Sequence, residues 1–231
     1  MSRRSTITLV LGGVVLAGAV AAAAWVYSVL NPPLPRIARG RTVIAAIGDS
    51  NTYGAGVFFD DMRNNAYPAR LEALLGRDHQ VLNYGLSGRT LVDSGDMPFT
   101  DNAFFAHSHE VAPDTVLIML GTNDSKPKNW DATRYEQDLT DFVASYAGLP
   151  NPPRICLLTP PAAYDNSAGI DPSVISEQIV PIIRRVAREH DVEVIDVNAA
   201  TQGRPELFPD GVHPNAAGYA IIAETVFAAL R

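Results

Sequence analysis

Short apolar runs alternate with longer helical patterns from residue 42 to the end of the chain. Five runs have the length of a strand and lack regular apolar and polar alternation, namely residues 42–47, 80–84, 115–120, 154–159 and 192–197. Segments with helical periodicity occupy residues 67–75, 135–146, 174–188 and 216–230. Strands that are apolar on both faces are typical of a parallel sheet covered by helices. We therefore predict a three-layer α/β/α, flavodoxin-like sandwich with a five-stranded parallel sheet.

The N-terminal part of the chain has a different pattern. Residues 5–35 contain no charged side chain, and residues 6–30 are almost wholly apolar or small. At about 1.5 Å per residue, a helix of this length spans about 37 Å and can cross a hydrocarbon core of about 30 Å. We therefore predict an N-terminal apolar helix that anchors the protein in a membrane. A cleaved signal peptide is the main alternative, because Arg3 and Arg4 precede the apolar stretch and three alanines follow at 22–24.

A change of composition near Asn31 divides the chain into three parts. We assign residues 1–30 to the anchor or signal segment, residues 31–40 to a proline-rich linker, and residues 41–231 to a single catalytic domain. The arginines on the two sides of the apolar segment nearly balance, so they do not fix its orientation. Because such segments usually serve export, we expect the catalytic domain outside the cytoplasm, either membrane-anchored or secreted.

Composition excludes several classes of function. The net charge is −7, with acidic and basic residues interspersed, so a nucleic-acid partner is not expected. Cys156 is the only cysteine, which rules out an internal disulfide, and its apolar run predicts a small buried side chain. His107 and His109 lack further ligand candidates, and there is no phosphate-binding loop. We therefore expect neither a metal nor a cofactor, and the oligomeric state stays open.

Candidate chemistry lies in three distant fragments that follow or close after predicted strands, residues 48–51 (GDSN), 121–124 (GTND) and 210–213 (DGVH). A serine hydroxyl needs a base to accept its proton and a third group to orient that base. Ser50 can be the nucleophile, and His213 and Asp210, three residues apart on one loop, can be the base and its orienting group. The alternative for this loop is that Asp210 caps the next helix and His213 is a surface residue. In parallel sheets, sites form beyond the carboxyl ends of the strands, where all three residues are expected.

Negative charge that develops on an attacked carbonyl oxygen needs fixed hydrogen-bond donors. The backbone N–H groups of Ser50 and Gly88 and the side-chain amide of Asn123 are candidates. A glycine at position 88 allows a close approach and unusual backbone angles. Either Gly88 or Asn123 alone is equally compatible with an ordinary turn or helix cap.

Four sequence blocks resemble the SGNH hydrolases, also called the GDSL esterase and lipase family. Residues 47–54 (IGDSNTYG) resemble the first block, with Asn51 where many members have leucine. Residues 83–88 (NYGLSG) resemble the second, 121–124 (GTND) the third, and 210–215 (DGVHPN) the last. The similarity covers about residues 42–231. It implies a carboxylic ester hydrolase in which Ser50, His213 and Asp210 form the catalytic triad, and Ser50, Gly88 and Asn123 donate to the oxyanion.

The substrate is less constrained by the sequence. Trp130 can form a wall for a sugar face, and Arg89 can meet an anionic group, so we predict that both contact substrate. Ordinary surface packing is the alternative for each. Short spacers between the blocks predict hydrolysis of small acyl esters, such as acetyl groups on carbohydrate. Lysophospholipase or thioesterase activity is the nearest alternative. The alternative that is not an enzyme is a catalytically silent domain that binds the cell envelope.

Overall fold

The computed structural model describes Tyr27 and residues 32–57 and 62–231. The chain divides into two units, Met1–Pro33 and Leu34–Arg231, and the second contains all strands and helices given below. The predicted apolar helix over residues 1–30 lies outside the described residues, apart from Tyr27. Within the described ranges, no helix combines the length and the apolar character that crossing a membrane requires.

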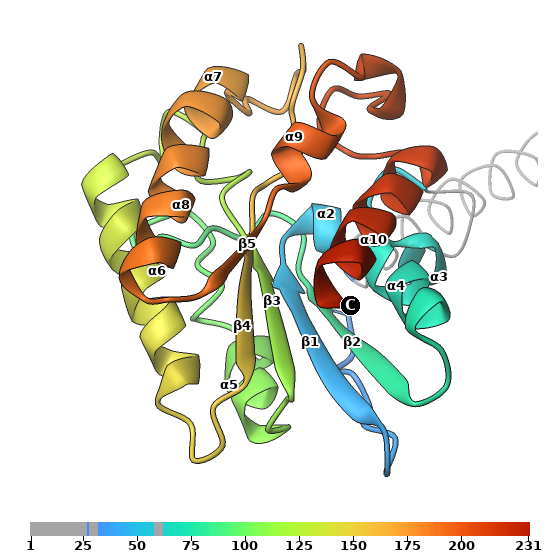
Figure 1. Ribbon diagram of the computed structural model, residues 1–231. Helices are drawn as coiled ribbons and strands as arrows, with labels where there is room; N and C mark the ends of the chain where they lie inside the picture. The colour runs from blue at the N-terminus through green and yellow to red at the C-terminus, as the bar shows by residue number, and fades with distance from the viewer. Residues whose placement is uncertain (1–26, 28–31, 58–61) are drawn as a thin grey trace, which may run out of the picture. The chain divides into compact units, whose positions relative to one another are not determined.

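A five-stranded sheet forms the centre of the second unit, as predicted. Its strands are β1 (Thr42–Gly48), β2 (His79–Gly85), β3 (Thr115–Met119), β4 (Arg154–Leu158) and β5 (Glu193–Ile195). The order is β2-β1-β3-β4-β5, and every neighbouring pair is parallel. This is the doubly wound order of flavodoxin-like folds. All carboxyl ends therefore meet at one edge of the sheet (Figure 1).

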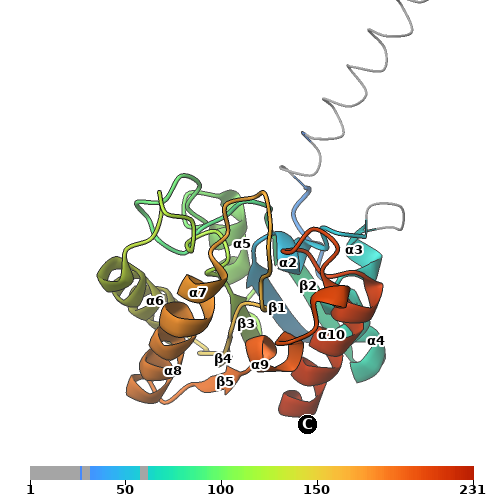
Figure 2. The same cartoon turned by 90° about the horizontal axis from the view of Figure 1, so that it is seen from above.

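Helices cover both faces of the sheet (Figures 1 and 2). One face carries α4 (Tyr67–Leu75), α9 (Val197–Thr201) and α10 (Ala216–Leu230), and the other carries α5 (Ala103–Glu110), α6 (Ala132–Ala147) and α8 (Val180–Glu189). The remaining short elements are α2 (Ser50–Tyr53), α3 (Met62–Asn65), α7 (Pro172–Val174), the π-helical turn η1 (Ile175–Ile179) and the 3₁₀ turn η2 (Pro205–Leu207).

The residues of β1 show why both faces are apolar. Val43, Ala45 and Ile47 pack with the core under α5, α6 and α8. Ile44 and Ala46 pack with the opposite core under α4, α9 and α10. Successive side chains of a strand point to opposite faces, so a strand between two helical layers has to be apolar throughout.

Helix α5 and the short helices α2, α3 and α9 were not predicted, and two predicted elements have clearly different bounds in the structure. β5 ends at Ile195, shorter than the predicted 192–197, because Asp196 starts α9 by accepting a hydrogen bond from the Ala199 N–H. The helical pattern at 174–188 begins earlier, at Pro172, where Asp171 caps α7. It also contains the π-helical turn η1, which apolar periodicity alone does not reveal.

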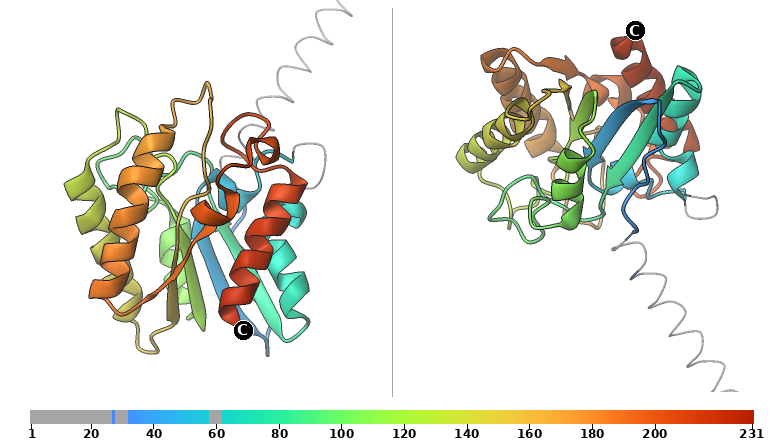
Figure 3. Two further views of the ribbon diagram at one scale, coloured as in Figure 1. Left: turned by 45° about the horizontal axis from the view of Figure 1, so that its top comes forward. Right: turned by 90° about the horizontal axis from the view of Figure 1, so that it is seen from below.

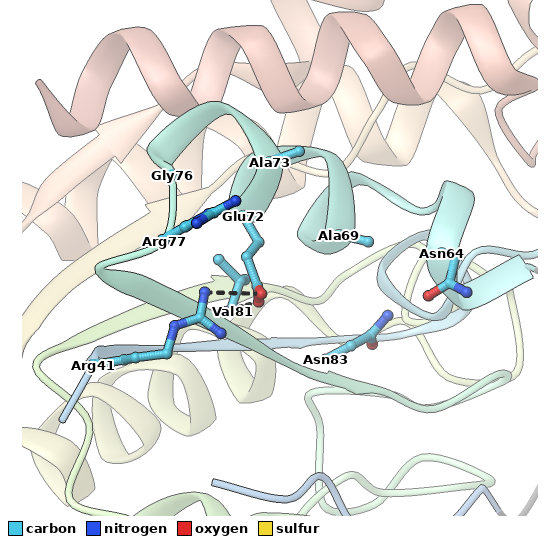
Figure 4. Close-up of a pocket in the computed structure, with 9 residues that line it drawn as sticks. All are labelled: Arg41, Asn64, Ala69, Glu72, Ala73, Gly76, Arg77, Val81 and Asn83. Atoms are coloured by element: carbon cyan, nitrogen blue, oxygen red, sulfur yellow. Dashed lines mark hydrogen bonds and ion pairs between the residues drawn. The ribbon is translucent and has the colours of Figure 1, made fainter. Parts of the chain in front are cut away.

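The outer edge of β2 is protected by side chains. Glu72 of α4 accepts a hydrogen bond from the Val81 N–H at 2.8 Å and forms an ion pair with Arg41 at 3.0 Å. A cavity of about 610 Å³ lies beside this pair, and Figure 4 shows Arg41 directed toward Glu72. None of the predicted catalytic residues lines it. Satisfied backbone groups make an edge strand less prone to pair with another chain, so we interpret this region as edge protection.

Candidate active site

Ser50 is the first residue of α2, directly after β1. Asp49 caps this helix, because its carboxylate accepts a hydrogen bond from the Asn51 N–H at 2.8 Å. A side chain at Gly48 would meet the Thr52 hydroxyl at 2.0 Å and the Met119 carbonyl oxygen at 2.7 Å, so only glycine allows this close turn. Ser50 is held at the carboxyl edge of the sheet with 7% of its surface exposed.

The structure brings Ser50, His213 and Asp210 into one hydrogen-bonded chain. The Ser50 Oγ lies 2.9 Å from the His213 Nε2, and the His213 Nδ1 lies 2.7 Å from the Asp210 Oδ2. These distances are in the range of direct hydrogen bonds. Ser50 and His213 are 163 positions apart in the sequence, and the parallel sheet is what brings them together.

The loop that carries His213 is fixed by its own aspartate. Although burial on its own would raise it, the pKa of Asp210 is held below its usual value by hydrogen bonds from the backbone and ring of His213 and from the Val212 N–H. The backbone bonds measure 2.7 Å from His213 and 3.0 Å from Val212. Gly211 has φ of +79°, and a side chain there would lie 2.1 Å from the Asp165 carbonyl oxygen. Asp210 therefore stays ionised and aligned with the imidazole.

The three predicted oxyanion donors have groups available for a ligand. The N–H groups of Ser50 and Gly88 donate to no acceptor among the described residues. Gly88 has φ of +82°, a conformation that favours glycine. The Asn123 amide donates to the Arg89 carbonyl oxygen at 3.1 Å, which uses one of its two hydrogens. This bond ties Asn123 to the segment that contains Gly88.

Asp124 makes a second connection that the sequence reasoning missed. Its carboxylate accepts hydrogen bonds from the N–H groups of Leu91, at 2.9 and 3.1 Å, and Val92, at 2.9 Å. Asp124 is fully buried, and burial raises its pKa to about 7. Its place in the GTND block was the available signal, but no rule of spacing predicts which backbone it binds.

Asp49 and Asn51 are also buried beneath the site. Burial raises the pKa of Asp49 to about 6. The Asn51 amide lies 3.3 Å from the Thr122 hydroxyl, so the residue that replaces the common leucine connects the first block to the third. Asn51 is 1% exposed. Its side chain thus contributes to packing between the loops.

The structure places the two predicted substrate-binding residues in different surroundings. The Trp130 indole N–H donates to Gln178 at 3.0 Å, and its ring packs against Tyr135, so this side chain joins the start of α6 to η1. The Arg89 guanidinium is half-buried next to Gly88, and burial lowers its pKa. Its Nε is buried without a hydrogen-bond partner among the described residues. Substrate contact by either residue stays a prediction.

In the described part of the chain, no group of histidine, cysteine, aspartate and glutamate side chains could hold a metal ion. The two candidate histidines have other partners. His107 lies 2.8 Å from the Tyr84 hydroxyl, and His109 lies 3.1 Å from the Ser145 hydroxyl.

Comparison with known proteins agrees with this fold. Over 208 residues, the chain is 35% identical to an acetylxylan esterase of Xylanibacter ruminicola. The aligned region covers 81% of this chain but only 43% of that protein, so the chain spans less than half of the relative's length.

Two solved structures share the architecture. A carbohydrate acetylesterase family member from Sinorhizobium meliloti has a TM-score of 0.68 at 22% identity, over 82% of this chain and 97% of that one. An alpha/beta hydrolase enzyme from the metagenome of Lake Arreo, Spain, has a TM-score of 0.63 at 27% identity, over 81% and 94% of the two chains. Residues 46–221, which include all four sequence blocks, match the GDSL-like Lipase/Acylhydrolase family. The chain therefore belongs to this family of carboxylic ester hydrolases.

Proposed function

We propose that this protein removes small acyl groups, chiefly acetyl, from carbohydrate through an acyl-enzyme intermediate on Ser50. The observation that carries the proposal is the hydrogen-bonded chain from the Ser50 Oγ through the His213 ring to the Asp210 carboxylate, at 2.9 and 2.7 Å. A serine in this arrangement can lose its proton to the imidazole as it attacks a carbonyl carbon.

In the first half of the reaction, Ser50 attacks the ester carbonyl and His213 Nε2 accepts its proton. Asp210 holds the ring by its Nδ1–H and stabilises the imidazolium that forms. When the tetrahedral intermediate collapses, the C–O bond to the alcohol breaks and His213 protonates the leaving oxygen. In the second half, His213 takes a proton from water, which attacks the acyl-enzyme. Collapse returns the proton to Ser50 and releases the carboxylic acid.

The carbonyl oxygen gains negative charge in both halves. The free N–H groups of Ser50 and Gly88 and the second hydrogen of the Asn123 amide are the donors for this charge. Such donors act in the transition state more strongly than in the ground state, which raises kcat rather than binding.

Two observations support acetyl groups on carbohydrate as the substrate. The relative with 35% identity is named an acetylxylan esterase. No lid-sized insertion separates the sequence blocks, which favours a shallow site for small acyl groups. Lysophospholipase and thioesterase activity would need room for a long acyl chain or a thiol carrier.

The test has two stages. A fluorophosphonate probe labels an activated serine, and absence of labelling at Ser50 would support the catalytically silent alternative. Kinetics on p-nitrophenyl esters with two to twelve acyl carbons, below their micelle-forming concentrations, then define the acyl group. We expect the highest kcat/KM for acetyl, with acetate released from acetylated xylan. Equal or higher kcat/KM for dodecanoyl would overturn the acetyl proposal in favour of lysophospholipase activity.

We also propose that residues 1–30 place the enzyme at a membrane, outside the cytoplasm. The support is the uncharged stretch over residues 5–35, which is long enough to span a bilayer. Full-length protein in the carbonate-washed membrane fraction is the expected result. A mature chain that starts near Trp25 would show a cleaved signal instead, and full-length protein in the cytosol would refute both.

A further inference from the structure

A second cavity, of about 220 Å³, opens where the loop after β4 faces α7 and α9. Its walls come from three segments: the loop residues 162–164, the turn from α7 into η1, and α9. The loop rises at the carboxyl end of the sheet, beside the segment that carries Asp210 and His213 (Figure 3). We call this the Tyr164 cavity, lined by Tyr164, Ser173, Ser176, Asn198, Gln202 and small neighbouring residues.

The walls are tied directly to the proposed catalytic loops. The Tyr164 N–H donates to the Gly211 carbonyl oxygen at 2.8 Å, between Asp210 and His213 in the chain. On the other wall, the Asp171 N–H donates to the Ser125 hydroxyl at 3.1 Å, two residues after Asn123. Hydrogen bonds therefore join the cavity walls to two of the loops that would hold the reacting ester, the loop of His213 and the loop of Asn123.

The cavity is preformed rather than loosely assembled. The Tyr164 hydroxyl donates to the Thr201 carbonyl oxygen at 2.7 Å and accepts from the Arg204 N–H at 2.8 Å. Asn198 of α9 donates to the Pro160 carbonyl oxygen at 3.1 Å. These bonds fix the loop to α9 without a ligand. A fixed site spares a ligand part of the cost of ordering the protein.

The chemistry of the lining selects for a neutral polar ligand. Hydroxyl, amide and aromatic groups line the cavity, and none of the lining residues is charged. The side chains of Ser173 and Gln202 have no hydrogen-bond partner among the described residues and face solvent. Because the Tyr164 hydroxyl already makes two hydrogen bonds, only its aromatic ring is available to a ligand. An anionic ligand would find no counter-charge here, and an acyl chain would leave polar groups unpaired.

The size of the cavity limits the size of the ligand that it can hold. Pockets for drug-sized ligands usually measure about 300–1,000 Å³, so 220 Å³ admits only a small unit. Ser176 lies within η1, and π-helical turns occur frequently at functional sites.

We propose that the Tyr164 cavity binds one neutral sugar ring next to the acetylated ring. This inference rests on the proposed carbohydrate esterase function. A substrate of several sugar units would thereby gain affinity over a single acetylated sugar.

The test compares substrates of different length in the full chain. We would measure kcat and KM on p-nitrophenyl acetate and on acetylated xylo-oligosaccharides of one to four units. The variants are S173A/Q202A, which removes the unpaired polar groups, and Q202W, which places a bulky ring at the opening. Q137A is the matched control, because Gln137 is an exposed glutamine on α6, outside the cavity lining.

The wild type should gain at least about tenfold in kcat/KM from one to three sugar units, mainly through a lower KM. Both cavity variants should lose that gain yet keep the wild-type rate on p-nitrophenyl acetate within twofold. Q137A should behave as wild type. A wild type with no gain from added sugar units, or cavity variants that retain the full gain, would overturn this inference while ester hydrolysis stands. A wild type inactive on both substrate types would instead refute the proposed function.

Discussion

The carboxylate of Asp124 holds the backbone N–H of Leu91 by hydrogen bonds of 2.9 and 3.1 Å. A further bond reaches the Val92 N–H at 2.9 Å. Asp124 follows Asn123, and Leu91 lies three residues after Gly88, so this contact sets the distance between two proposed oxyanion donors. It acts with the bond from Asn123 to the Arg89 carbonyl oxygen. The alignment of these donors therefore depends on a side chain that need not touch substrate.

We predict that Asp124→Asn lowers kcat at least about tenfold with little change in KM. The amide oxygen can still accept from both N–H groups at the place of Oδ1, but an NH2 group then replaces Oδ2 and faces the Leu91 N–H, and an unsatisfied buried donor costs about 1–3 kcal/mol. Steady-state kinetics and thermal unfolding check the result. Asp141→Asn is the matched control, because Asp141 is exposed on α6 and should change neither quantity. A lower melting temperature with unchanged kcat would limit Asp124 to a structural role.

How far the sequence predicts this arrangement depends on the kind of contact. The five strands, their parallel direction and the positions of Ser50, His213 and Asp210 at one edge follow from the apolar runs and the motif order. The bond from Asp124 to Leu91 does not, because a buried carboxylate can satisfy any nearby N–H and only the folded loop decides which. The π-helical turn is hidden for a related reason: one extra residue barely disturbs an apolar helical pattern.

Ser50→Ala and His213→Ala should each abolish nearly all esterase activity, and the double variant should be little worse than either. The two side chains share one proton transfer across the 2.9 Å hydrogen bond, so loss of either disables the same step. Rates on p-nitrophenyl acetate should fall by roughly 10³-fold or more. Losses that multiply in the double variant, or more than about a tenth of the activity left in Ser50→Ala, would argue against one catalytic unit.

Asn123→Ala should lower kcat by about 10² to 10³ with a much smaller change in KM, since its free amide hydrogen meets charge that exists only in the transition state. Asn129→Ala is a useful comparison, because Asn129 donates to the Asn123 carbonyl oxygen at 3.0 Å and should affect kcat only through positioning. The expected order of kcat is therefore wild type, then Asn129→Ala, then Asn123→Ala. A raised KM with unchanged kcat would mean that Asn123 binds the ground state instead.

The two buried carboxyls predict that the fold loses stability as pH rises toward neutrality. Burial raises the pKa of Asp49 to about 6 and that of Asp124 to about 7, both above the ordinary value of 3.8. Between pH 4 and 7 the native state therefore binds more protons than the unfolded state. The contribution of these two groups to the free energy of unfolding is therefore greatest below pH 4. It is lost as the pH rises through 6 and 7.

Carboxyl groups whose pKa is lowered affect stability in a different pH range. Asp210 is one of them, and its contribution is lost only as pH falls below its ordinary range. Urea unfolding between pH 5 and 8 covers the range in which Asp49 and Asp124 act, and each of them can contribute at most about 1.4 kcal/mol per pH unit. Asp124→Asn should flatten the slope above pH 6, whereas Asp141→Asn should keep it. Equal slopes for Asp124→Asn and the wild type would show that Asp124 is ionised in the native state at pH 5.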